Sequence, residues 1–184
     1  MPSTAVAVAV LTLATLSTAG CHRSKHARAS SFTPPPIPAG FAEQTNPGWR
    51  IDVPATWKDL KTPVGWAVSD PQAVDDFHAN VNVVREPFAG DSYEYARANE
   101  AALRHEPRAA VEIVREDVVD GDSTLVIESR WAPTPPSTVG YRTLQSALAS
   151  RGTGYVVRCS VSSSAFERYR STCESIAHSF AIER

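Results

Sequence analysis

Short segments in which apolar and polar residues alternate occur along most of the chain, and this period of two is typical of half-buried β-strands. Strands are predicted at residues 49–53, 66–69, 80–86, 110–119, 123–131, 139–148 and 154–161. Pro54 ends the first of them, because proline has no N–H group to donate to a strand ladder. Residues 55–60 are expected to form one helical turn, and residues 70–76 a polar loop.

Turn residues indicate how the later strands connect. Asp120-Gly121 separates two of the predicted strands, and Arg151-Gly152 separates two more. An Asp-Gly pair is a strong hairpin signal, since both residues accept the positive φ of a tight hairpin turn. The strands from residue 110 to residue 161 are therefore expected to form an antiparallel meander.

Two segments repeat their apolar residues at spacings of three and four, which predicts amphipathic helices. The first helix is expected to begin at Asp91 or Ser92, either of which can cap it, and to run to about His105. Its expected apolar face consists of Tyr95, Ala98 and Ala102. The second helix has the most regular stripe, formed by Phe166, Tyr169, Cys173, Ile176 and Phe180. The serines at 162–164 are expected to end the preceding strand and to cap this helix.

The first residues of the chain have a different pattern. Residues 5–16 are almost all Ala, Val and Leu, an apolar run shorter than the roughly 20 residues that span a bilayer. A run of this length followed by small residues is typical of a secretory signal peptide, which is predicted at residues 1–20. The protein is therefore expected to be exported from a bacterial cytoplasm.

The small residues that precede Cys21 resemble the lipobox of bacterial lipoproteins, with Ala19 and Gly20 as the matching positions. The resemblance implies that a diacylglycerol is attached to the Cys21 thiol and that the leader is cut just before it. More than one acyl chain makes such an anchor stable. The alternative is an ordinary signal peptide cut near Ala19 or Gly20, because Thr18 replaces the preferred Leu and no Lys or Arg precedes the apolar run.

Residues 21–40 are rich in Pro and Ser and contain little to bury, so they are predicted to be an extended tether. Residues 41–184 have the size of one domain with a single core. In the lipoprotein family an Asp after the cysteine favours the inner membrane. His22 stands there in this chain, so the outer membrane is expected if the organism has one.

The strand at 154–161 places Cys159 on its apolar face, and Cys173 belongs to the stripe of the second helix. Both cysteines therefore point at the same interface. In an oxidising compartment a Cys159–Cys173 disulfide is favoured, closing a loop of about 15 residues and contributing about 3 kcal/mol. The alternative is two buried thiols, which pack as small hydrophobic groups.

Charge and motifs indicate little chemistry. The net charge is −2 and the charges are interspersed, so no nucleic-acid partner is expected. The histidines and cysteines lack the spacing of a metal site, and Gly-x-Ser-x-Gly is absent. No catalytic, cofactor or metal residue is therefore predicted. Trp131 lies beside a proline-rich loop and is the candidate for an exposed partner surface. The alternative is packing in the core or at the sheet edge, because the tryptophans lie in or beside predicted strands.

The folded part resembles the PsbP-like family, of the DcrB and Mog type. The residues that carry the resemblance are Ile51-Asp52-Val53-Pro54 with Trp57, Asn80-Val81-Asn82-Val83, Tyr155-Val156-Val157, Phe166 with Tyr169, and Ile176 to Phe180. This resemblance implies an α+β fold, an α/β/α sandwich in which an antiparallel meander is flanked by two main helices. Members serve unrelated purposes, so the resemblance implies a fold and no catalytic site.

These observations predict a non-enzymatic lipoprotein of the bacterial cell envelope. It would be held to the membrane through its lipid and would bind an envelope protein as an accessory or assembly module. The alternative is an envelope protein that binds a small ligand or, further from the pattern, a hydrolase with an unrecognised site. A concave pocket with convergent polar groups would favour this alternative.

Overall fold

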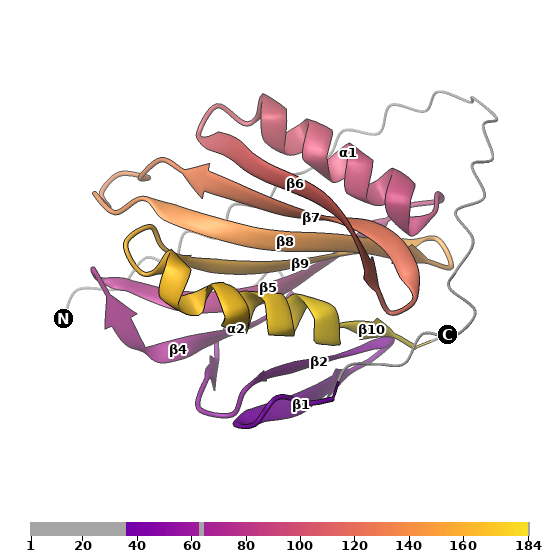
Figure 1. Cartoon of the computed structure of the whole chain (residues 1–184), viewed down its shortest axis with the longest axis horizontal. Helices are drawn as coiled ribbons and strands as arrows, with labels where there is room; N and C mark the ends of the chain where they lie inside the picture. Colours follow the sequence, from indigo (N-terminus) through magenta and orange to yellow (C-terminus); the bar gives the residue numbers. More distant parts are fainter. Residues whose placement is uncertain (1–35, 63–64, 184) are drawn as a thin grey trace.

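The computed structural model describes residues 36–62 and 65–183, which form ten β-strands and two α-helices (Figure 1). In chain order these are β1 (Phe41–Asn46), β2 (Trp49–Pro54), β3 (Lys58–Asp59), β4 (Trp66–Val74), β5 (Phe77–Pro87), α1 (Ser92–His105), β6 (Ala109–Val119), β7 (Asp122–Trp131), β8 (Tyr141–Ser150), β9 (Thr153–Ser162), α2 (Phe166–Ser179) and β10 (Ala181–Ile182). The predicted signal peptide, most of the predicted tether and Cys21 lie outside the described residues.

Seven strands form one antiparallel sheet in the order β3-β4-β5-β9-β8-β7-β6. The predicted meander from β6 to β9 is confirmed, since each of these strands pairs with the next. Both predicted turns are also confirmed: Asp120 and Gly121 have φ of 51° and 78°, and Arg151 and Gly152 have φ of 50° and 79°. These positive φ values match the right-handed twist of the hairpin strands.

The two helices lie on opposite faces of the large sheet (Figure 1). Helix α1 packs on β6, β7 and β8, whereas α2 packs on β8 and β9 and on strand β2 of a small sheet, β1-β2-β10. The core on the α2 face includes Ile51, Val81, Val83, Leu144, Leu148, Val157, Phe166 and Ile176. The core on the α1 face includes Tyr95, Leu103, Leu125, Ile127, Ala147 and Val156. Both faces of the sheet are therefore buried over much of their area, which confirms the predicted α+β sandwich.

Helix α1 begins where the sequence predicts. The Asp91 side chain accepts a hydrogen bond from the Glu94 N–H at 2.8 Å, and Glu94 bonds back to the Asp91 N–H, so the two form a capping box. The predicted apolar face was only partly right: Tyr95 is buried, but the buried side also includes Ala96, Asn99 and Leu103 in place of Ala98 and Ala102. Tyr95 lies against Gly154, where an added Cβ would come within 2.5 Å of the ring. Glycine at this position therefore lets the helix approach the sheet.

Two of the predicted irregular segments take a different form. Residues 55–60 contain a turn closed by the Trp57 N–H and the Pro54 carbonyl at 2.9 Å, followed by β3, and not a helical turn. Residues 70–74 belong to β4, whose pairing with β5 shifts between Ser69 and Ala73. Only Asp75 and Asp76, with φ of 54° and 58°, form the connection to β5.

The serines before α2 do not cap it. The N-cap residue is Ala165, which makes no side-chain cap bond. Ser164 instead donates to the Asp75 carboxylate in the β4–β5 turn. The expected cap is therefore wrong because the serine side chain is held by a neighbouring turn.

The last strand returns to the beginning of the fold. Strand β10 pairs with β2, placing Ala181 opposite Arg50 and Ile182 opposite Trp49. The Ser179 hydroxyl accepts from the Asp52 N–H at 2.9 Å, across 127 positions of sequence. The rings of Trp49 and Phe180 are 5.6 Å apart. The end of α2 is thus fixed to a strand formed early in the chain.

Candidate functional site

Trp131 is buried, so the prediction that it forms an exposed partner surface is wrong. Its side chain is 1% exposed and stacks on Tyr141 with ring centroids 5.7 Å apart. Its indole N–H donates to the Ser129 hydroxyl at 3.0 Å. Leu125 and Ile127 lie on the same face of β7, and Trp131 continues their alternation under α1. That alternation is the signal that could have placed the ring in the core.

The two cysteines of the folded part are joined by a disulfide, as the sequence predicts. Cys159 of β9 and Cys173 of α2 lie 14 positions apart, with their Cα atoms separated by 5.5 Å. Both residues are buried among the apolar side chains of the α2 face. The bond therefore fixes α2 to the middle of the large sheet.

A cavity of about 480 Å³ lies where the proline-rich loop meets the loop between α1 and β6. Two arginines line it, and both already have partners among the described residues. Arg108 bonds to Glu106 at 3.4 Å and to Thr134, and Arg130 bonds to Glu112 at 3.1 Å. The charged groups of this cavity are therefore engaged within the protein.

Strand β6 is the stronger candidate because it forms one edge of the large sheet. It pairs with β7 on one side and with no other strand that the structure describes. The described large apolar side chains that are exposed are Ile37, Ile113 and Val118, and two of these three lie on β6. An unpaired edge with exposed apolar groups is a template for another extended chain.

The side chains of β6 alternate between the two helices. Arg115 and Asp117 point toward α2, where they contact Glu174 at 3.2 Å and His178 at 2.9 Å. Ile113 has the same parity and lies on that side. Glu116 and Val118 lie on the α1 side. The edge therefore presents one exposed apolar group on each face.

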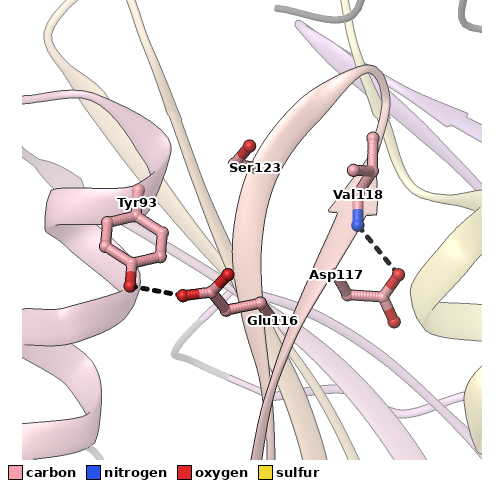
Figure 2. Close-up of a pocket in the computed structure, with 5 residues that line it drawn as sticks. All are labelled: Tyr93, Glu116, Asp117, Val118 and Ser123. Carbon is pink, nitrogen blue, oxygen red and sulfur yellow. Dashed lines mark hydrogen bonds between the residues drawn. The ribbon is translucent and has the colours of Figure 1, made fainter. Parts of the chain in front are cut away.

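A cavity of about 210 Å³ opens beside the end of β6 (Figure 2). It is lined by Tyr93, Glu116, Asp117, Val118 and Ser123. Figure 2 shows Glu116 directed toward Tyr93 of α1, while Asp117 turns to the other side of the strand. The Tyr93 hydroxyl donates to Glu116 at 2.9 Å, and this bond, followed by burial, raises the pKa of Tyr93 above its ordinary value.

Glu116 is the distinctive group of this cavity. Its side chain is exposed, and no Lys, Arg or His that the structure describes lies within ion-pair distance of it. Asp117 differs, since it is near Arg115 at 3.9 Å and bonds to His178. The cavity can therefore accept a cation from outside, at Glu116, next to the exposed Val118 side chain.

The described histidines give no sign of a nucleophile and base. His78 and His105 contact backbone carbonyl oxygens, and His178 contacts Asp117. No serine or cysteine side chain of residues 36–62 or 65–183 bonds to any of them. The same residues contain no group of three or more His, Cys, Asp or Glu side chains placed to hold a metal ion.

Within the described ranges, neither helix is long and apolar enough to cross a membrane. No family model matches the chain, and no curated protein matches it.

Solved structures share its fold at low sequence identity. The cyanobacterial PsbP protein CyanoP from Synechocystis is 16% identical, with a TM-score of 0.57 over 79% of this chain and 94% of that one. LpqN of Mycobacterium tuberculosis, described as involved in cell envelope biogenesis, is 12% identical, with a TM-score of 0.59 over 78% of this chain and 92% of that one. A putative regulator of unknown function from Pseudomonas aeruginosa, PA94, is 12% identical, with a TM-score of 0.52 over 79% and 99%. The chain therefore has a PsbP-like α+β fold.

Proposed function

We propose that this protein is a non-enzymatic accessory module of the bacterial cell envelope that binds a protein partner along the edge of β6. The observation that carries the proposal is the unpaired edge with Ile113 and Val118 exposed at 42% and 43%. In soluble proteins an edge strand is usually short, covered or charged. Here the charged residues of the strand are largely engaged with α1, α2 and β7, which leaves the two apolar groups to solvent.

The partner that fits is an extended segment that adds one strand to the sheet. Backbone hydrogen bonds to the outer edge of β6 would supply affinity, and the alternating side chains of the segment would supply specificity. One apolar side chain would pack on Ile113 and another on Val118. A lysine or arginine of the partner segment, next to the side chain that packs on Val118, would reach Glu116 in the cavity of Figure 2.

The similarity to LpqN supports the envelope part of the proposal, because LpqN has this fold and is described as involved in cell envelope biogenesis. The predicted signal peptide and tether are consistent with the same location. The hydrogen bonding of the described histidines supports the proposal that the module is non-enzymatic, because none of them bonds to a serine or cysteine side chain.

Site-specific crosslinking tests the docking surface. A photoreactive phenylalanine analogue at position 113 of the full chain, expressed in its own cells, is expected to give one discrete adduct in the envelope fraction. Val118→Arg in the same chain is expected to reduce that adduct at least about fivefold, since it places a cation where the cation of the partner would lie. The measurement is the adduct intensity on a blot, with mass spectrometry of the crosslinked segment.

Ala73→Arg is the matched control, because it introduces the same charge at an exposed position. Ala73 lies on β4, which is far from β6 in the strand order of the sheet. It is expected to leave the adduct unchanged. The proposal is overturned if position 113 gives no discrete adduct, or if Ala73→Arg and Val118→Arg reduce it equally.

The anchor is a separate part of the proposal. We expect the mature protein to begin at Cys21 with acyl groups attached, and Cys21→Ser to release the folded part from the membrane fraction. Intact-mass spectrometry of the purified mature protein measures the cleavage point and the acyl mass together. A mature chain that begins near Gly20 or Cys21 and carries no acyl mass would instead support an ordinary signal peptide.

A further inference from the structure

A row of three polar side chains crosses the large sheet on the face that carries α1. Asn82 of β5 is opposite Arg158 of β9, and Arg158 is opposite Gln145 of β8. Arg158 has the same parity as Val156, which belongs to the core beneath α1. Helix α1 packs mainly on β6, β7 and β8, so this row lies along the border of the covered area.

Arg158 is unusual among the half-buried arginines. The others, Arg50, Arg108, Arg142 and Arg170, each form an ion pair with a glutamate. Arg158 forms none with any residue that the structure describes. Its Nε–H donates to the Gln145 side-chain oxygen at 3.0 Å, and its guanidinium carbon lies 5.6 Å from the centre of the Trp131 ring.

The surroundings of Arg158 are costly for a cation. Burial lowers the pKa of its guanidinium, and the two ionisable groups that act against this shift are the hydroxyls of Tyr141 and Tyr95. Neither tyrosine carries a negative charge at neutral pH, since burial raises the pKa of both. A buried charge is usually paired, because desolvation is only offset by a counter-charge.

Two neighbouring amide groups are also incompletely bonded. The side-chain nitrogen of Gln145 is buried and has no hydrogen-bond partner, and Gln145 itself is fully buried. The side-chain oxygen of Asn82 is likewise buried without a partner. Rotation of the Asn82 amide by 180° exchanges its oxygen and nitrogen, so this residue can also present a donor. Apart from the Arg158–Gln145 bond, the remaining N–H groups of Arg158, the Gln145 amide nitrogen and the rotated Asn82 amide then form a set of donors without an acceptor among the described residues.

We propose that this row is a binding site for an oxyanion, the carboxylate or phosphate group of a small ligand. The guanidinium of Arg158 supplies the positive charge and two or more N–H donors, a geometry suited to carboxylate and phosphate oxygens. The Gln145 amide supplies a further donor. The stacked rings of Trp131 and Tyr141 are buried beside the guanidinium and form the apolar support behind it. This site does not involve β6 and stands independently of the proposed partner surface.

The test uses the wild-type full chain in a non-ionic detergent, with isotope labelling and NMR detection. Acetate, inorganic phosphate and acetamide are titrated separately at constant ionic strength. Acetamide has nearly the shape of acetate and no charge. We expect acetate, phosphate or both to shift the Arg158 Nε–H and the Trp131 indole N–H saturably, and acetamide to leave them unshifted. Saturation by one anion alone supports the site and assigns the ligand to that chemical class.

Arg158→Gln is expected to weaken anion binding at least about tenfold, since the loss of a charged hydrogen-bond donor typically has that effect. Arg85→Gln is the matched control, because Arg85 is exposed and lies over Tyr155, whose ring belongs to the core on the opposite, α2 face of the sheet. It is expected to change the affinity less than twofold. The wild-type titration remains decisive if Arg158→Gln fails to fold. The proposal is overturned if neither anion gives a saturable shift, if acetamide shifts the same resonances equally, or if both arginine variants weaken binding alike.

Discussion

Replacing Trp131 with alanine is expected to lower the free energy of unfolding by about 3–5 kcal/mol, the usual cost of removing a large buried aromatic ring. The ring is 1% exposed and stacks on Tyr141, so its removal leaves a cavity between β7, β8 and the α1 layer. It also leaves the Ser129 hydroxyl without the donor that now reaches it at 3.0 Å. Urea-induced unfolding of the full chain, followed by far-UV circular dichroism, measures the loss.

Trp131→Phe is the matched control, because it keeps most of the apolar volume and removes the indole N–H. Its cost should be clearly smaller than that of Trp131→Ala. A loss below about 1 kcal/mol for the alanine variant would be typical of a surface position and would contradict the buried placement.

Removal of the disulfide is expected to lower the free energy of unfolding by about 3 kcal/mol, because the bond closes a short loop and so restricts the unfolded chain. The variant is Cys159→Ala with Cys173→Ala, at two positions that are 1% and 0% exposed. Alanine fits both sites without a buried polar group, so most of the effect comes from the lost crosslink. Guanidinium unfolding under oxidising conditions compares this variant with the wild type.

A reductant separates the crosslink from packing changes. It should destabilise the wild type by a similar amount and leave the double variant unaffected. If the reductant changes the free energy of unfolding of neither protein, Cys159 and Cys173 are thiols in solution. Cys21→Ser serves as a further control, since the bond joins Cys159 to Cys173 and its loss should not depend on Cys21.

Local signals were sufficient for much of the fold. The turn at Asp120-Gly121 was predictable because an Asp-Gly pair accepts the φ values of 51° and 78° that the structure shows. The cap at Asp91 and the stripe of α2 were predictable because both depend on residues three or four positions apart. The disulfide followed from two such local patterns that share an interface.

The errors lie where distant residues decide the structure. Asp70 was expected in a loop, but its carboxylate accepts from the Tyr169 hydroxyl at 2.8 Å and its carbonyl oxygen contacts His78 at 2.8 Å. Those contacts keep the chain in β4 beyond the irregular pairing. Trp131 was expected at the surface because of the prolines after it, whereas the α1 face of the sheet accommodates its ring.

The candidate sites were harder to predict than the fold. An edge strand is defined by the order of strands in space, and nothing within residues 109–119 shows that β6 lies at the end of the sheet. The Asn82–Arg158–Gln145 row depends on the registers of β5, β9 and β8 together. A single arginine at an alternate strand position gives no signal of that kind.

The pairing of β10 with β2 also determines when the fold can be completed. Synthesis proceeds from the amino end, so the β1–β2 hairpin is made long before Ala181 and Ile182, which supply its third strand. Until then β2 has one open edge, and Trp49 lacks its Phe180 neighbour. The small sheet therefore stays incompletely paired until the last residues of the chain have been made. During that time its open edge exposes the protein to proteolysis and aggregation.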